Sequence, residues 1–131
     1  MQDRITLLDV LEATGLRVRA TDLVPFAHWI TPVQEPRRYD TRFFLARPPD
    51  GAEATADLRE MTDLAWVAPE AALDRFRAGS LPMVFPTVRT LEGLVGFDSV
   101  DDAVDAHRDR AIPAILPRLV RTENGVGIVV D

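Results

Sequence analysis

The chain of 131 residues contains no cysteine and no lysine. Without cysteine it has no disulfide, no thiolate nucleophile and no thiolate metal ligand, which agrees with a cytoplasmic location. The 15 basic residues are therefore all arginine, and 21 acidic residues outnumber them to give a net charge of -6. Because nonspecific nucleic-acid binding requires a basic face, no nucleic-acid partner is expected.

Long apolar runs are also missing. No run approaches the ~20 residues that a membrane-spanning helix needs, and residues 1–4 lack the basic-then-apolar layout of a signal peptide. A cytoplasmic protein with no membrane partner is therefore expected. Hydrophobic residues make up 47% and charged residues 27%, as in ordinary globular proteins. The length suits one domain, residues 1–131, in which folding buries about two-thirds of the surface that the unfolded chain exposes.

Apolar periodicity and turn residues predict short helices and strands in mixed order. Helices are expected over 3–14, from Pro69 to Gly79, over 87–95 and after a cap at Ser99. Strands are expected over 16–19, 23–30, 41–47 and 63–67, and a closing hairpin over 119–130 turns at Asn124-Gly125. In the 23–30 strand, the alternation places Val24, Phe26, His28 and Ile30 on one face and Ala27 and Trp29 on the other. Such a mixture predicts an α+β fold.

The most informative region is a loop between two apolar strands, 23–30 and 41–47, which carries Arg37, Arg38 and Arg42. Such a loop holds a polar ligand on a rigid scaffold, and guanidinium forks match phosphate oxygens. The alternative is that Asp40 pairs with one arginine while the others are solvated. Trp29 has two interpretations as well, because it can stack on a base or acyl group, yet aromatic residues in apolar strands more often belong to the core.

The sequence of this region resembles that of a known family. Trp29-Ile30-Thr31-Pro32, a short gap and Arg37-Arg38-Tyr39-Asp40-Thr41-Arg42-Phe43-Phe44-Leu45-Ala46 are similar to the second half of Nudix hydrolases, in the subgroup of the peroxisomal coenzyme A diphosphatases. The resemblance implies an α/β/α sandwich and hydrolysis of a nucleoside-diphosphate-linked substrate, such as coenzyme A, with Mg or Mn. It also implies substrate-binding roles for Trp29, Thr31, Arg37, Arg38, Asp40 and Arg42.

The catalytic signature of that family, a glycine followed at fixed spacing by Glu, Arg-Glu, Glu-Glu and Gly, is found in no window of the sequence. The only Arg-Glu pair, Arg59-Glu60, lacks the paired glutamates and the glycine. In the family this box precedes the Trp-Ile-Thr-Pro segment. We therefore expect the C-terminal portion of a Nudix-like domain, an incomplete sandwich that ends in a helix and a β-hairpin, or a shortened relative that has lost its metal site.

Three further groups of residues have two interpretations each. Glu60 matches a loop glutamate that assists metal binding or acts as a base in the family; otherwise it is a solvated carboxylate, since a lone carboxylate holds magnesium poorly. His28 and His107 lack the partners of a catalytic triad and are expected in the core or at its boundary. Five aspartates at helical spacing form an acidic ridge: Asp98, Asp101, Asp102, Asp105 and Asp109. They are expected either to bind a metal ion, or to complement the positive dipole at the start of a helix and form its solvent-exposed face.

Three hypotheses follow, and they leave open whether the chain is itself an enzyme. In the first, it supplies the substrate-binding half of a coenzyme A-type diphosphatase, binds a small phosphate-bearing ligand and is inactive alone. In the second, it is a noncatalytic ligand-binding or interaction domain on a degenerate Nudix fold. In the third, unpaired strand edges drive self-association into a homo-oligomer, with Phe43, Phe44 or Trp29 buried across the interface.

Overall fold

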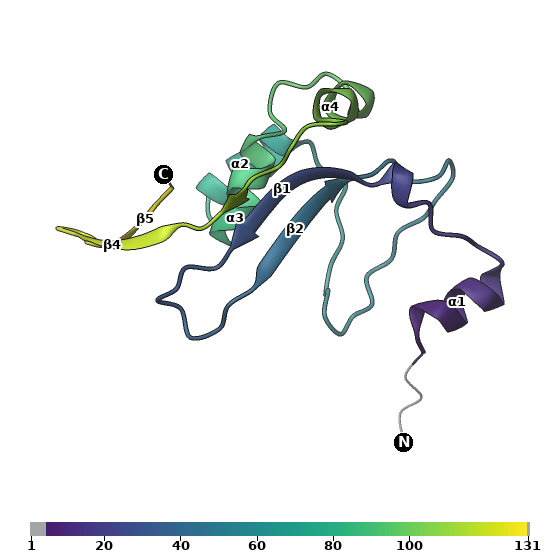
Figure 1. The fold of residues 1–131 in the computed structure, drawn as a ribbon, viewed down its shortest axis with the longest axis horizontal. Helices are drawn as coiled ribbons and strands as arrows, with labels where there is room; N and C mark the ends of the chain where they lie inside the picture. Colours follow the sequence, from purple (N-terminus) through teal and green to yellow (C-terminus); the bar gives the residue numbers. More distant parts are fainter. Residues whose placement is uncertain (1–4, 131) are drawn as a thin grey trace.

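A three-stranded sheet forms the centre of the computed structural model, which describes residues 5–130 (Figure 1). The central strand β1 (Val24–Ile30) pairs antiparallel with β2 (Asp40–Leu45) on one side and parallel with β3 (Ala114–Ile115) on the other. The last two strands, β4 (Arg118–Thr122) and β5 (Gly125–Val129), form a separate antiparallel hairpin. The connection between β1 and β2 is the arginine-containing loop that the sequence predicts to bind a ligand.

Three helices accompany the sheet, and a fourth stands apart from it (Figure 1). Helices α3 (Phe85–Glu92) and α4 (Val100–His107) contact β1, and α2 (Pro69–Arg77) packs on α3. Helix α1 (Leu7–Thr14) lies at the far end of the molecule, before the short 3₁₀ turn η1 (Ala20–Asp22). This is the mixed α and β arrangement that the sequence predicts. No helix within residues 5–130 has the length and apolar character to cross a membrane.

A β-bulge in β1 changes which side chains the sheet buries. The register runs from Pro25↔Phe44 directly to Ala27↔Phe43, so Phe26 is an extra residue in the ladder. A bulge places consecutive side chains on one side of a strand. Phe26 therefore shares a face with Trp29, which corrects the predicted grouping of Phe26 with His28. Both buried aromatic side chains face the helices: Phe26 packs edge-on against His107, and Trp29 against Phe85.

The core is a small layer between β1 and the helices α2, α3 and α4. Its buried apolar side chains come from β1, α2 and α4: Val24, Phe26, Trp29, Ala72, Leu73 and Ala103. Helix α2 contributes Ala72 and Leu73 to this layer, and α4 contributes Ala103. His107 is buried too, with Nδ1 2.8 Å from the Ala103 carbonyl oxygen, as expected of a core histidine.

Local start and stop signals place most element ends. Pro69 opens α2, and Gly79 follows the helix with a left-handed φ of 73°. Ser99 caps α4 as predicted, because its side chain accepts a hydrogen bond from the Asp102 amide. Helix α3 begins two residues before the predicted start, since proline is favoured in the first turn of a helix. The predicted closing hairpin is confirmed by β4 and β5, but its turn lies at Glu123-Asn124, because Gly125 already pairs with Thr122 as the first residue of β5.

Two predicted strands, 16–19 and 63–67, do not form. Their apolar residues are exposed instead, with 65% of Leu16 and 77% of Trp66 accessible. Both edges of β1 are already occupied by β2 and β3, and neither segment pairs with the free outer edge of β2 or β3. Alternating polarity makes a strand only where a partner satisfies its backbone groups. These two predictions were therefore wrong for a tertiary reason.

Candidate functional site

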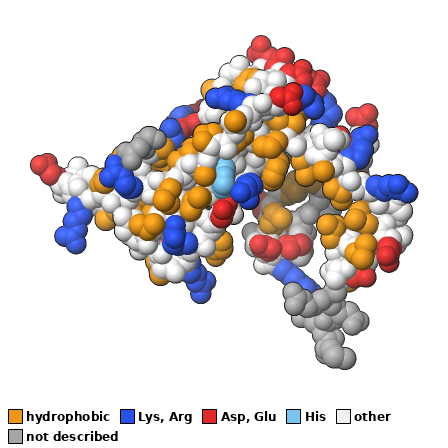
Figure 2. Space-filling view, in the orientation of Figure 1, with side chains coloured by type: hydrophobic (Ala, Val, Ile, Leu, Met, Phe, Trp, Pro, Cys, Tyr) orange, Lys and Arg blue, Asp and Glu red, His pale blue; other side chains and the backbone are white. Residues whose placement is uncertain are grey.

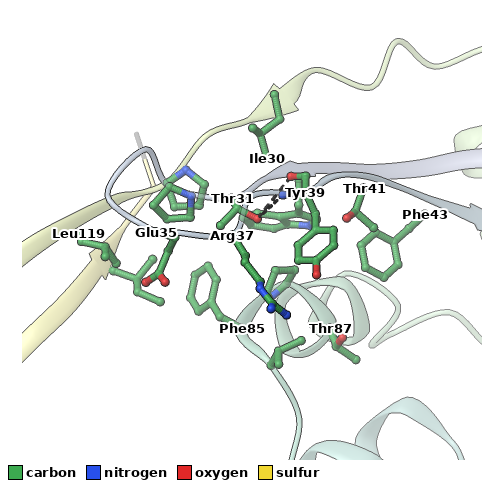
Figure 3. A pocket seen from close by; sticks show the side chains of 16 residues that line it. Ile30, Thr31, Glu35, Arg37, Tyr39, Thr41, Phe43, Phe85, Thr87 and Leu119 are labelled. Carbon is green, nitrogen blue, oxygen red and sulfur yellow. Dashed lines mark hydrogen bonds between the residues drawn. The ribbon is translucent and has the colours of Figure 1, made fainter. Parts of the chain in front are cut away.

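A cleft of about 520 Å³ opens where the β1–β2 connection meets the start of α3 and the β4–β5 hairpin (Figure 3). Four segments line it. They are the end of β1 with its following loop (29–32, 35 and 37), one face of β2 and the residue before it (39, 41 and 43), the start of α3 (84–87), and residues 117, 119 and 128 near the hairpin. The cleft therefore joins parts of the chain that are about ninety residues apart in sequence.

Hydrogen bonds between Thr31 and Tyr39 close the loop that borders the cleft (Figure 3). The Thr31 amide donates to the Tyr39 carbonyl oxygen at 3.0 Å, and the Tyr39 amide donates to the Thr31 hydroxyl at 3.0 Å. Arg38 Nε donates to the Thr31 carbonyl oxygen at 3.1 Å. Of the predicted ligand-binding residues, Thr31 and Arg38 thus fix the shape of the loop.

Alternation along the second strand decides which side chains reach the cleft. Tyr39, Thr41 and Phe43 line it, while Asp40 and Arg42 lie on the opposite face of the sheet. Arg37 also lines the cleft, and Figure 3 shows its guanidinium directed toward Phe85 and Thr87 at the start of α3. Within residues 5–130, Arg37 forms no ion pair. Its charge is therefore available to an anion in the cleft.

The opposite face of the sheet holds a separate polar cluster. His28 Nε2 lies 2.6 Å from Asp40 Oδ1, and the Arg42 guanidinium is 4.0 Å from the same oxygen. Asp40 thus lies closer to His28 than to Arg42, whereas the sequence indicates only an arginine as its partner. The structure therefore brings Trp29, Thr31 and Arg37 together in the cleft, and it separates Asp40 and Arg42 from them.

Trp29 belongs to both the core and the cleft. Only 6% of this residue is exposed, and its ring stands edge-on to Phe85 with the centroids 5.7 Å apart. Its indole Nε1 is buried and finds no acceptor among the described residues. A buried indole N–H without a partner is uncommon, because tyrosine and tryptophan polar atoms usually find one when buried. The core interpretation of Trp29 accounts for its ring but not for this nitrogen.

The sequence interpretation missed several lining residues. Tyr39 and Phe43 alternate with Asp40 and Arg42, so the period of two in this strand was a usable signal. The remaining contributions had no local signal, because they come from α3 and the hairpin: Phe85, Leu119 and Ile128. Glu35 was also missed; its side chain lies toward Leu119 in Figure 3, apart from the Arg37 guanidinium.

Glu60 lies outside the cleft, in the long exposed connection between β2 and α2. Asp57 organises this turn, because its Oδ1 accepts hydrogen bonds from the amides of Arg59, Glu60 and Met61. These hydrogen bonds hold the pKa of the Asp57 carboxyl below its ordinary value, and the bond from the Met61 amide has the largest effect. The structure thus gives Glu60 a backbone position in a turn, and its catalytic role stays a prediction.

The acidic ridge is engaged in ordinary contacts. Asp101 pairs with Arg47 at 2.6 Å, Asp102 shares the helix cap with Ser99, and Asp105 lies 3.9 Å from Arg108. Among residues 5–130, no three acidic or histidine side chains gather in a group that could hold a metal. Acidic side chains gather over α4 at the top of Figure 2. Glu35 is the one carboxylate among the described residues that line the cleft, so this cleft does not fit magnesium or manganese by itself.

Comparison with known proteins gives one informative match. No protein-family profile and no solved structure match the chain. The chain is 32% identical, over 119 residues, to the acyl-coenzyme A diphosphatase NUDT19 of Gallus gallus. The match covers 85% of this chain but 31% of that protein, so the chain spans about a third of the length of its relative. Over most of its length, the chain is therefore related in sequence to a Nudix protein.

Proposed function

We propose that the cleft binds a phosphate-bearing ligand of the coenzyme A type, and that this chain supplies the substrate-binding part of a Nudix-type diphosphatase. The observation that carries the proposal is the position of Arg37. Its guanidinium, which forms no ion pair within residues 5–130, lines an aromatic cleft and points toward the start of α3, a helix end without a side-chain cap. A guanidinium and a helix N-terminus both favour the oxygens of a phosphate group.

The other walls suit the uncharged parts of such a ligand. Coenzyme A combines phosphate groups with a flexible arm and an aromatic base, and a bound acyl chain adds apolar surface. Four aromatic side chains line the cleft to receive these parts: Trp29, Tyr39, Phe43 and Phe85. Small-molecule pockets are typically about 300–1,000 Å³, mostly apolar and equipped with a few polar groups. The cleft matches that description, and the relationship to an acyl-coenzyme A diphosphatase supports the choice of a coenzyme A-type ligand.

Binding and hydrolysis are separate claims for this chain. Divalent metal is part of Nudix chemistry, since it neutralises phosphate charge and lowers the pKa of the attacking water. The described residues present no three-ligand group for such an ion, and the sequence lacks the family signature that supplies the ligands. We therefore propose that the chain binds without turnover. A Nudix-like sandwich and a catalytic Glu60 belong to the same proposal and are not needed for binding.

The test is calorimetric titration of the chain with coenzyme A. Arg37→Ala should weaken binding by about tenfold to a hundredfold, because a charged hydrogen bond to phosphate contributes about 1.5–3 kcal/mol. Arg42→Ala is the matched control, since it removes the same charge from the opposite face of the sheet. Equal binding by Arg37→Ala and the unaltered chain would reject the cleft as the phosphate site.

The absence of turnover has its own measurement. Phosphate release from coenzyme A is followed in the presence of magnesium or manganese. Turnover above about 0.1 per second, slow for an enzyme, that disappears with a chelator would contradict the binding-only role. Binding without turnover is also what a noncatalytic domain on a degenerate Nudix fold would show, and the relationship to a diphosphatase is the reason to favour the first interpretation.

A further inference from the structure

The outer edge of β2 is an unpaired sheet edge within the described chain. The strand order β2-β1-β3 places β2 at one side of the sheet, with β1 as its single partner. Asp40, Thr41 and Arg42 are exposed, and 48% of Phe44 is accessible. Sheet edges are commonly protected by charged side chains, proline or a bulge on the edge strand itself. Strand β2 has no proline, the bulge of this pair belongs to β1, and the two charged residues of β2, Asp40 and Arg42, have opposite signs.

The register shows which backbone groups face that edge. The Thr31 amide bonds to the Tyr39 carbonyl oxygen, so this pair begins the ladder with its backbone groups turned inward. In an antiparallel ladder, inward pairs alternate with pairs whose backbone groups point away from each other. Trp29↔Thr41 is therefore an inward pair. It follows that Asp40 and Arg42 direct their amide and carbonyl groups to the free edge.

We propose that β2 pairs antiparallel with β2 of a second copy of this chain, around a two-fold axis at Thr41. In this register, Asp40 of each copy lies opposite Arg42 of the other. The outward backbone groups of Asp40 and Arg42 then bond across the new interface, which a closed, self-complementary dimer requires. The inference does not depend on the ligand proposed for the cleft.

Side-chain charge selects this register over its neighbours. Only residues whose backbone groups point to the free edge can bond across the interface, so these residues of the two copies must lie opposite each other. The two-fold axis can therefore be placed at successive residues of β2. Each move of the axis by one residue shifts the pairing between the two copies by two residues. An axis at Arg42 sets two guanidinium groups directly opposite, which is destabilising. An axis at Phe43 sets Arg42 against Phe44 and leaves Asp40 beyond the strand. The axis at Thr41 alone gives two opposite-charge pairs.

The cleft face of the strand is complementary in the same register. Tyr39 lies opposite Phe43 of the second copy, and Thr41 lies opposite Thr41. Aromatic pairs and threonine pairs are both favourable across antiparallel strands. Tyr39 is 64% exposed in the single chain and gains cover in this arrangement. Because Tyr39, Thr41 and Phe43 also line the cleft, the dimer sets two clefts side by side.

A single engineered thiol tests the position of the axis. Residues that face each other in a non-hydrogen-bonded pair have Cα atoms about 4.5 Å apart, which falls in the range that a disulfide spans. Since the chain has no cysteine, Thr41→Cys introduces the sole thiol. We expect it to form a covalent dimer in a glutathione redox buffer. Thr55→Cys, at an exposed residue of the long loop, is the matched control and should remain monomeric.

Charge exchange tests the register independently. Sedimentation equilibrium is measured from about 1 to about 500 µM protein, because dimer formation depends on concentration. Asp40→Arg and Arg42→Asp should each weaken self-association by about tenfold or more, since like charges then face each other. Mixing the two variants should restore association, as each supplies the charge that the other lacks. Arg17→Asp, an exposed change of the same charge, should leave association unaltered.

Three results would overturn the proposal. The first is a chain that stays monomeric over the whole concentration range. The second is equal cross-linking of Thr41→Cys and Thr55→Cys, which would show that no axis lies at Thr41. The third is a mixture of Asp40→Arg and Arg42→Asp that associates no better than either variant alone, while circular dichroism shows that both are folded. If the chain dimerises but the mixture shows that third result, the two copies associate through a surface other than β2.

Discussion

Helices α1 and α4 have the same length and the same kind of start, yet only α4 is part of the core. Each has eight residues and a hydroxyl cap that accepts a hydrogen bond from the third helical amide, Thr6 from Asp9 and Ser99 from Asp102. Helix α4 buries Ala103 and His107, whereas α1 buries no residue and stands away from the sheet (Figure 1). A cap and an apolar stripe start a helix, but a packing partner decides what the helix contributes to stability.

The exposed stripe of α1 makes this difference concrete. Leu7 and Leu8 of this helix, and Ile5 just before it, are 67%, 63% and 75% exposed. An isolated helix of this length is marginal in water, because few residues share the cost of its first turn. We therefore expect α1 to open locally while the rest of the chain remains folded.

The largest effect is expected in the packed half. Phe26→Ala removes a buried ring that contacts His107 at 4.6 Å between centroids. The free energy of unfolding should fall by about 3–5 kcal/mol, as for other buried phenylalanines. Leu8→Ala is the comparison in α1 and should change it by less than about 0.5 kcal/mol. Urea denaturation followed by circular dichroism measures both; similar losses for the two variants would show that α1 packs as part of the core.

A smaller effect is expected from the two caps. Ser99→Ala should lower the free energy of unfolding by about 1 kcal/mol, because the Asp102 amide loses its acceptor in a helix that the core depends on. Thr6→Ala removes the equivalent acceptor of Asp9. It should leave the global transition in place and speed amide exchange over residues 8–14. A global shift from Thr6→Ala would contradict the independence of α1.

The smallest effect concerns pH. Hydrogen bonds from the Thr6 side chain, and then from its backbone amide, hold the pKa of Asp9 below its usual 3.8. A lowered pKa in the folded state means that the cap is at full strength above 3.8 and is lost as the pH falls through the lowered value. NMR shifts of residues 8–14 should move in that acidic range. Asp9→Asn should remove this titration, and its persistence would assign it to another group.

The sequence predicted features that depend on neighbouring residues. Pro69, Gly79 and Ser99 mark helix ends through their own backbone or side-chain chemistry, and the closing hairpin follows its turn residues. The bulge at Phe26 was not predictable in this way, because the packing of its ring against His107 accompanies an extra residue in the ladder. Pairing also decided the fate of 16–19 and 63–67, because neither segment pairs with a strand of the sheet.

In the candidate site, too, some features follow from neighbouring residues in the sequence and others depend on the folded chain. Trp29, Thr31 and Arg37 border one cleft because they lie within a few residues of one another around the β1–β2 connection. Arg42 does not line this cleft, because its position in β2 places it on the opposite face of the sheet from Thr41 and Phe43. Contributions from α3 and the hairpin required the folded chain, because no spacing in the sequence links Phe85 or Ile128 to this connection.

The location of the ligand site is the central claim, and the two tryptophans test it most directly. Trp29 lines the cleft with a buried, unpartnered indole N–H, while Trp66 lies 77% exposed in the loop that holds Glu60. Coenzyme A is titrated into ¹⁵N-labelled protein, and Trp66→Phe assigns the two indole signals. We predict that the Trp29 signal shifts until saturation while the Trp66 signal stays in place. A shift of Trp66 alone, or of neither signal, would contradict binding in the cleft.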